Sequence, residues 1–214
     1  MSRKINPSHY LLYDWLAPLY DLGIWLLALL AGGEGRLRAP VLKGLEGKGE
    51  RVLEIFAGTA TLGLAAAQKG ARVTAVDITG GMLRVAKEKA VRSGLDVAFV
   101  RADAALLPFK DGAFDRVIVS LGLHETPAGN VPLIFKEAAR VLADGGRFSI
   151  FDFYKAEGVT AALQSLFFTF FEGETAKAWV RLDLQRLLSD AGFKSFRRSF
   201  LADKAFQFIT VEKN

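Results

Sequence analysis

The sequence predicts an α/β protein built on a doubly wound, mostly parallel sheet. From residue 49 onward, short runs rich in β-branched residues alternate with longer helical patterns, which favours parallel strands joined by right-handed crossovers. The strand runs are almost continuously apolar, as expected when helices cover both faces of a sheet. The 214 residues, 51% of them hydrophobic and 24% charged, are those of an ordinary globular protein with a sizeable core.

The expected elements follow one another along the chain. Buried strands are expected at residues 51–56, 71–77, 96–103, 114–122 and 146–153. Helices are expected at residues 61–70, 81–94 and 131–146, and glycine ends each of them. The apolar spacing of residues 182–192 predicts one more helix. Two β-patterned runs, 193–200 and 204–213, flank a short turn and predict an antiparallel hairpin.

We expect an N-terminal helical cover segment at residues 1–48 and one domain at residues 49–214, with a helical, lid-like insertion at about residues 156–180. The first segment is apolar, but three residues interrupt it: Asp14, Pro18 and Asp21. Its longest uninterrupted run, 22–33, is shorter than the ~20 residues that span a bilayer. We therefore expect neither a signal peptide nor a spanning helix. The segment could cover an apolar pocket or lie against a membrane surface, and we favour the pocket.

Composition excludes several chemistries. There are no cysteines, so disulfides, thiolate nucleophiles and cysteine-ligated metal centres are ruled out. The two histidines, His9 and His124, stand far apart in sequence, and we expect no metal site. The net charge of +5 is a mild excess that indicates solubility more than an anionic partner.

The segment after the first expected strand is the most informative. An acid, Glu54, lies at the strand end, and a small-residue turn with Gly58 leads into a helix. In doubly wound sheets, ligands bind at the carboxyl ends of the strands. Glycine lets a ligand approach the backbone, and the helix start at residues 59–62 offers amide donors.

Two further acids follow the next strand ends. Asp77 could accept both hydroxyls of a ribose, and Asp103 could accept from the exocyclic amine of adenine. Ile78 and Met82 could sandwich the adenine ring. Each acid alone is typical of a turn or cap, but acids at three consecutive strand ends favour a nucleoside whose tail carries a cation.

These motifs resemble those of the class I S-adenosylmethionine-dependent methyltransferases over about residues 50–155. The matching segments are EIFAGTA (54–60), VTAVDITGGML (73–83), RADAALLPF (101–109) and ARVLADGGRFSIFDF (139–153). The resemblance implies a seven-stranded Rossmann-like sheet with an antiparallel last strand, S-adenosylmethionine as cofactor and S-adenosylhomocysteine as product. It implies cofactor contacts at Glu54, Phe56, Ala57, Gly58, Thr59, Asp77, Ile78, Met82, Asp103, Ala104 and Ser120. The chain departs from the family at Phe56 and Ala60, where glycine is common, and Phe56 puts bulk near the cofactor tail.

The N-terminus adds a second resemblance. YDWLAPLYD (13–21) is similar to the start of ubiquinone/menaquinone methyltransferases and bacterial phosphatidylethanolamine N-methyltransferases. This implies that Tyr20 lies over the cofactor and that Tyr13 lines the acceptor pocket, although both could be core residues on one helix face. Aromatic residues that could form an apolar lid are Trp25, Phe167, Phe168, Phe170 and Phe171, with Phe167 and Phe171 in the substrate pocket. An apolar mouth suits a quinone, a lipid or another hydrophobic molecule.

The loop after the fourth strand, residues 120–126, would face the transferred methyl group. His124 is the candidate base or orienting residue, since an imidazole titrates near neutral pH. Glu125 is a weaker candidate. The alternative for His124 is a loop histidine that hydrogen-bonds the backbone.

The sequence thus predicts a cytoplasmic methyltransferase for a hydrophobic small molecule, quinone or lipid headgroup, with peripheral membrane contact left open and the oligomeric state undetermined. An RNA methyltransferase is a lesser alternative, because Lys194, Arg197 and Arg198 form a short basic cluster. The residues at 120–123 lack the Asn/Asp-Pro-Pro-aromatic motif of nucleobase amino-methyltransferases. A nicotinamide-dependent oxidoreductase ranks low because its glycine spacing is absent. A non-catalytic nucleoside-binding domain also remains open.

Overall fold

The computed structural model describes residues 39–45, 49–168 and 173–214. Most of the expected cover segment, including Tyr13, Tyr20 and Trp25, lies outside these residues, and so do Phe170 and Phe171; of that segment the structure describes residues 39–45. Within the described part of the chain, no helix combines the length and apolar character needed to cross a membrane.

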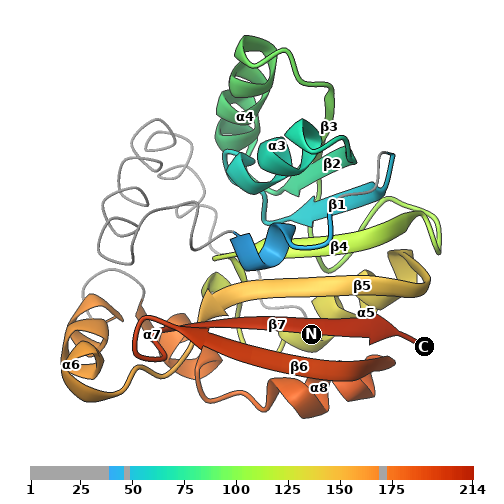
Figure 1. Cartoon of the computed structure of the whole chain (residues 1–214). Coiled ribbons are helices and arrows are strands. Elements are labelled where there is room, and N and C mark those ends of the chain that lie inside the picture. The colour runs from blue at the N-terminus through green and yellow to red at the C-terminus, as the bar shows by residue number, and fades with distance from the viewer. Residues whose placement is uncertain (1–38, 46–48, 169–172) are drawn as a thin grey trace.

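One seven-stranded sheet organises the structure, in the order β3-β2-β1-β4-β5-β7-β6 (Figure 1). Its strands are β1 (Arg51–Ile55), β2 (Arg72–Asp77), β3 (Val97–Arg101), β4 (Phe114–Ser120), β5 (Leu142–Phe153), β6 (Phe193–Leu201) and β7 (Phe206–Lys213). The first five are mutually parallel, and β7 runs antiparallel to both of its neighbours, β5 and β6. The predicted fold class is therefore confirmed. The strand order reverses between β1 and β4, and such a switch point is where doubly wound sheets bind ligands.

Helices cover both faces of this sheet. They are α3 (Thr61–Gln68), α4 (Gly80–Arg92), α5 (Val131–Val141), α6 (Gly158–Phe167), α7 (Gly173–Trp179) and α8 (Leu184–Asp190), with a 3-10 turn η1 (Leu123–Glu125). Helix α3 packs on β1 and β2, and α4 packs on β2 and β3. On the other face, α5 packs on β5 and α8, and α8 packs on β6. Helices α6 and α7 lie beyond the carboxyl ends of the parallel strands (Figure 1).

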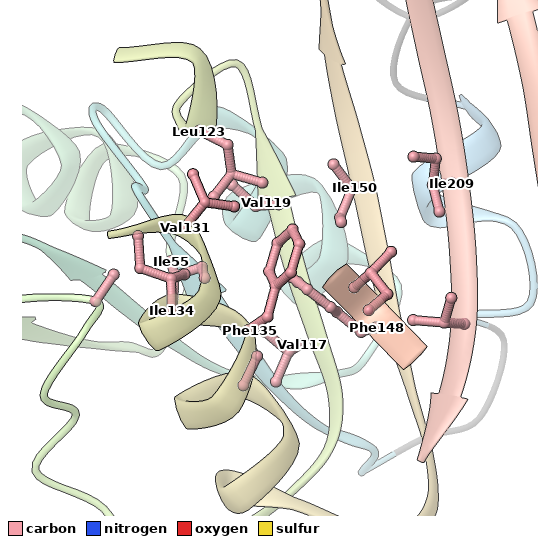
Figure 2. Close-up of a cluster of buried hydrophobic side chains, with 14 of the residues drawn as sticks. Ile55, Val117, Val119, Leu123, Val131, Ile134, Phe135, Phe148, Ile150 and Ile209 are labelled. Carbon is pink, nitrogen blue, oxygen red and sulfur yellow. The ribbon is translucent and has the colours of Figure 1, made fainter. Parts of the chain in front are cut away.

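The alternation of side chains along β4 explains why both faces are covered. Val117 and Val119 are fully buried in the cluster that includes α5, whereas Ile118 between them is fully buried in a cluster with Leu62 of α3. Successive strand residues point to opposite faces, so a continuously apolar strand needs a helix on each. Figure 2 shows the α5 side of this core, where Phe135 lies among the strand side chains.

One boundary prediction was wrong. The helix expected at 131–146 ends at Val141, and β5 begins at Leu142. Leu142 is extended, with φ −73° and ψ 140°, and it pairs with Phe114 of β4. Because the pairing register then shifts, the chain between Leu142 and Arg147 forms an irregular strand start rather than a last helical turn. Gly145, with φ 73°, supplies the left-handed residue that this path requires.

Near the amino-terminal end of β4, a buried cation fastens residues 39–45 to the sheet. The Arg116 side chain is 5% exposed and lies 3.1 Å from a Glu50 carboxylate oxygen. The same guanidinium donates to the carbonyl oxygens of Lys43 at 3.3 Å and Gly44 at 3.0 Å. A buried charge paired in this way is costly to disturb, because removing one partner strands the others.

Candidate active site

The acid at the end of β1 fixes the helix that follows it. Glu54 is 2% exposed, and its Oε2 accepts a hydrogen bond from the backbone N–H of Gly63 in α3 at 3.0 Å. A Cβ at position 63 would collide with that carboxylate, so glycine allows the close approach. Glu54 therefore orders the loop, and its direct contact with a cofactor stays a prediction.

The loop between β1 and α3 has left-handed backbone at alternate residues. Phe56, Gly58 and Ala60 have φ values of 54°, 53° and 54°. This conformation costs a residue with a side chain about 1–2 kcal/mol, and it explains why glycine is common there in the resembled motif. Phe56 and Ala60 therefore adopt the left-handed backbone conformation that glycine favours. Phe56 is half-buried and lies directly against Gly122, where a Cβ would collide with the phenylalanine side chain. The loop after β1 therefore contacts the loop after β4.

Asp77 joins the loops that follow β1 and β2. Its Oδ2 accepts from the Gly58 N–H and its Oδ1 from the Thr79 N–H, both at 2.8 Å. Each carboxylate oxygen has a second lone pair, and the side chain is only half-buried. The predicted role, accepting the two hydroxyls of a ribose, fits this placement.

The remaining expected cofactor residues occupy the same edge in different ways. Ala57 is buried, with its N–H donating to Val76 O at 3.0 Å, and Ser120 is half-buried at the end of β4. The Thr59 hydroxyl accepts from Lys89 Nζ of α4 at 2.9 Å, so this side chain fastens the loop before α3 to α4. Helix α3 begins at Thr61, without a side-chain cap.

The adenine-side residues follow β2 and β3. Ile78 is half-buried, Met82 is buried in the first turn of α4, and Ala104 is buried beside exposed Asp103. One oxygen of Asp103 accepts from Ala105 N–H at 2.8 Å, which shapes the turn. The proposed contacts with the base stay predictions.

Two α5 residues that sequence reasoning missed hold the loop carrying Asp103. Glu137 Oε2 accepts from Leu107 N–H at 2.8 Å, and Arg140 donates to the carbonyls of Leu107 at 3.0 Å and Phe109 at 2.7 Å. Glu137 and Arg140 also form two side-chain bonds of 2.8 Å with each other. The Arg140 guanidinium holds the pKa of Glu137 below its usual range against partial burial, and Glu137 raises the pKa of Arg140.

The loop after β4 places His124 in a buried pair. His124 is 2% exposed, and its Nδ1 lies 2.6 Å from Oδ1 of Asp152, which is fully buried in β5. The other oxygen of Asp152 accepts from Leu123 N–H at 2.9 Å. Sequence reasoning found His124 but missed Asp152, although an acid in a strand as apolar as 146–153 was a signal.

The insertion packs beside this pair. The Phe153 ring meets the His124 ring edge-on at 4.7 Å, and helix α7 packs against η1. Trp179 Nε1 donates to Phe153 O at 2.9 Å, and Phe168 packs on Phe153 with ring centroids 5.2 Å apart. Phe168 is thus placed near the histidine, while the side chain of Phe167 falls outside the described part of the structure.

Comparison with known proteins gives the class. A family model described as a methyltransferase domain matches residues 52–146. An uncharacterized methyltransferase of Synechocystis sp. is 31% identical over 204 residues, 94% of this chain and 93% of its own. A solved SAM-dependent methyltransferase of Methanosarcina mazei is 25% identical with a TM-score of 0.65, over 81% of this chain and 97% of its own. The fold, the candidate site at the carboxyl ends of the parallel strands and these similarities together define the class of protein as a methyltransferase.

The chain belongs to the family of S-adenosylmethionine-dependent methyltransferases. A demethylmenaquinone methyltransferase of Thermus thermophilus is 38% identical over 144 residues, 66% of this chain and 64% of its own. A ubiquinone/menaquinone biosynthesis C-methyltransferase of Brucella anthropi is 37% identical over 145 residues, 67% of this chain and 46% of its own. The chain thus spans less than two thirds of the length of these two relatives.

Proposed function

We propose that this chain transfers the methyl group of S-adenosylmethionine to a carbon of a quinone-type hydrophobic acceptor. The observation that carries the proposal is the junction of three strand-end loops, where Asp77 binds the loop after β1 and Phe56 meets Gly122 after β4. The relatives named for demethylmenaquinone and for ubiquinone/menaquinone biosynthesis support the acceptor class.

The cofactor would lie along this edge. Asp77 would accept the ribose hydroxyls, Asp103 and Ala104 would meet the adenine, and Gly58 would allow close approach to the backbone. The cofactor supplies a methyl group on a good leaving group, so the protein's main task is alignment. Positioning of this kind can contribute as much as ~7–11 kcal/mol.

The acceptor side would lie between Phe56, His124 and the insertion. The reduced, hydroquinone form of a quinone-type acceptor is aromatic, and when it gains a methyl group on a ring carbon it must lose a proton from that carbon. His124 would take this proton, a role worth about 10²–10⁴-fold in rate. Phe56, Phe153 and Phe168 would provide an apolar surround that excludes water.

Calorimetry tests cofactor binding directly. We expect S-adenosylmethionine and S-adenosylhomocysteine to bind the parent protein, and Asp77→Asn to weaken both at least tenfold, since it removes an ionised acceptor. Asp96→Asn, an exposed acid outside the site, is the matched control and should bind normally. Absence of binding, or an undiminished affinity in Asp77→Asn, contradicts the proposal.

Acceptor class is tested by following S-adenosylhomocysteine release. Demethylmenaquinone kept in its reduced hydroquinone form should support turnover, because that form has an electron-rich aromatic carbon, whereas the oxidised quinone, phosphatidylethanolamine and RNA should not. Turnover with RNA alone would establish the alternative RNA methyltransferase. Nucleoside binding without turnover on any acceptor would favour a binding domain.

A further inference from the structure

We propose that Asp152 is a positioning residue that fixes His124 as the Nδ1–H tautomer and leaves Nε2 to accept the acceptor's proton. This inference rests on the proposed methyl transfer and names the residue through which its base acts. Asp152 itself touches neither the cofactor nor the acceptor in this assignment.

One carboxylate holds both the ring and the backbone of the turn. Oδ1 lies 2.6 Å from His124 Nδ1 and accepts from its own neighbour, Phe153 N–H, at 2.7 Å. Oδ2 accepts from the N–H groups of Leu123 at 2.9 Å and His124 at 3.4 Å. Asp152 lies within β5, paired with Gln207 of β7, so its own position is set by the sheet.

The hydrogen-bond pattern decides where the ring proton lies. The three backbone N–H groups can only donate, so they require both carboxylate oxygens as acceptors. An unprotonated Nδ1 facing such an oxygen at 2.6 Å would set lone pair against lone pair. The proton therefore sits on Nδ1, and in the neutral ring Nε2 carries the lone pair.

The surroundings hold the ring in one orientation. The edge-on Phe153 ring contacts it, and the Phe153 carbonyl is itself fixed by Trp179 Nε1 at 2.9 Å and Gln207 Nε2 at 2.8 Å. Helix α7 packs against the turn from the insertion. A base oriented in this way does not need to find its rotamer during the reaction.

The acceptor is taken in its reduced hydroquinone form, whose electron-rich aromatic ring supplies the pair for the new carbon–methyl bond, and the sulfur–methyl pair returns to sulfur. The proton on the methylated carbon passes to His124 Nε2, and its bonding pair restores the aromatic ring. The resulting imidazolium is stabilised by the ionised Asp152 at Nδ1, as charge-assisted hydrogen bonds are the stronger kind.

The tautomer of His124 can be measured because the chain has only two histidines. A His9→Gln variant leaves His124 as the single imidazole, and ¹⁵N–¹H correlation spectra of the neutral ring distinguish its two nitrogens. We expect a protonated Nδ1 and an unprotonated Nε2. The opposite assignment in protein with intact Asp152 overturns the inference.

The second arm introduces Asp152→Asn in the same background. The amide oxygen can still accept from the turn, but the NH₂ group would face Nδ1 and move the ring proton to Nε2. We expect kcat to fall by about 10²–10⁴-fold, with KM for the acceptor and the affinity for S-adenosylhomocysteine changed less than about threefold. Asp152→Glu, which retains the carboxylate, should recover part of the lost kcat.

Each outcome separates the two claims. A flipped tautomer with undiminished kcat overturns the role of Asp152 and leaves the methyltransferase proposal standing. A parent protein that transfers no methyl group refutes the proposed function, while its spectrum still decides the tautomer. If Asp152→Asn does not fold, the spectrum of the His9→Gln protein provides the decision.

Discussion

Replacing Glu137 by glutamine should destabilise the protein by loosening the loop that carries Asp103. The substitution removes the charge from a two-bond pair with Arg140 and weakens the acceptor for Leu107 N–H. Hydrogen bonds to charged groups contribute about 1.5–3 kcal/mol. Because the Arg140 and Glu137 side chains are 31% and 17% exposed, solvent screening reduces this figure. We expect a loss of about 1–2 kcal/mol.

Urea denaturation at neutral pH measures this loss, as a fall of about 0.5 M in the transition midpoint. Glu174→Gln is the matched control, since Glu174 and Lys177 form the same i,i+3 pairing on α7 but the Glu174 side chain is 88% exposed. The control should leave the midpoint unchanged. Equal effects of the two substitutions, or none from Glu137→Gln, would refute the reasoning.

The same pair predicts a pH dependence. Arg140 lowers the pKa of Glu137 in the folded protein, so the stabilisation is present above the unfolded value of ~4.3 and disappears as pH falls through the lowered folded value. The difference in unfolding free energy between the parent and Glu137→Gln should therefore shrink below about pH 4.3. If this difference in unfolding free energy stays constant until Glu137 is fully protonated, the charge of Glu137 does not contribute to stability. Affinity for S-adenosylhomocysteine should fall several-fold in Glu137→Gln, because the adenine-side loop is less ordered.

Two further substitutions test the packing around the sheet. Arg116→Met should lower the unfolding free energy by about 3 kcal/mol, because it leaves a carboxylate and two carbonyl oxygens without their donor. Arg72→Met, at an exposed site, should have little effect. Urea titration of the two variants measures the difference. Gly63→Ala should cost about 1–3 kcal/mol because its Cβ would meet the Glu54 carboxylate. Gly129→Ala, where a Cβ meets nothing within 4 Å, should be neutral or slightly stabilising, so thermal midpoints that move in the same direction for both glycines would contradict this account.

Much of the fold could be predicted because local patterns and burial agree along most of the chain. The apolar run at residues 117–119 is interpretable without coordinates, since a strand covered on both faces buries Val117, Ile118 and Val119 together. The start of β5 could not be predicted in the same way. Leu142 follows a helix and precedes two glycines, and its strand pairing with Phe114 depends on a register that only the assembled sheet defines.

The candidate site also contains residues that could be predicted from the sequence and residues whose contacts depend on tertiary packing. Asp77 could be placed at the carboxyl edge of the sheet because it ends a strand, where parallel sheets bring ligands, and its role there stays a prediction. Arg140 and Glu137 have the spacing of an ordinary solvated pair on a helix, and their bonds to the loop arise from tertiary packing. Asp152 was missed because an acid within an apolar run was interpreted only as part of a strand. Its partner lies 28 positions away, in the turn after β4.

The position of β7 between β5 and β6 affects how the chain can fold during synthesis. A nascent chain translated only as far as Leu201 contains both flanking strands but lacks the one that bonds to each of them. The edges of β5 and β6 that would bond to β7 therefore carry unpaired backbone N–H and C=O groups, which can pair with other chains. It also lacks Gln207, one of the donors that fix the carbonyl beside the histidine. Stop codons or proteolytic nicks before residue 206 should thus yield aggregating fragments rather than a shortened, working enzyme.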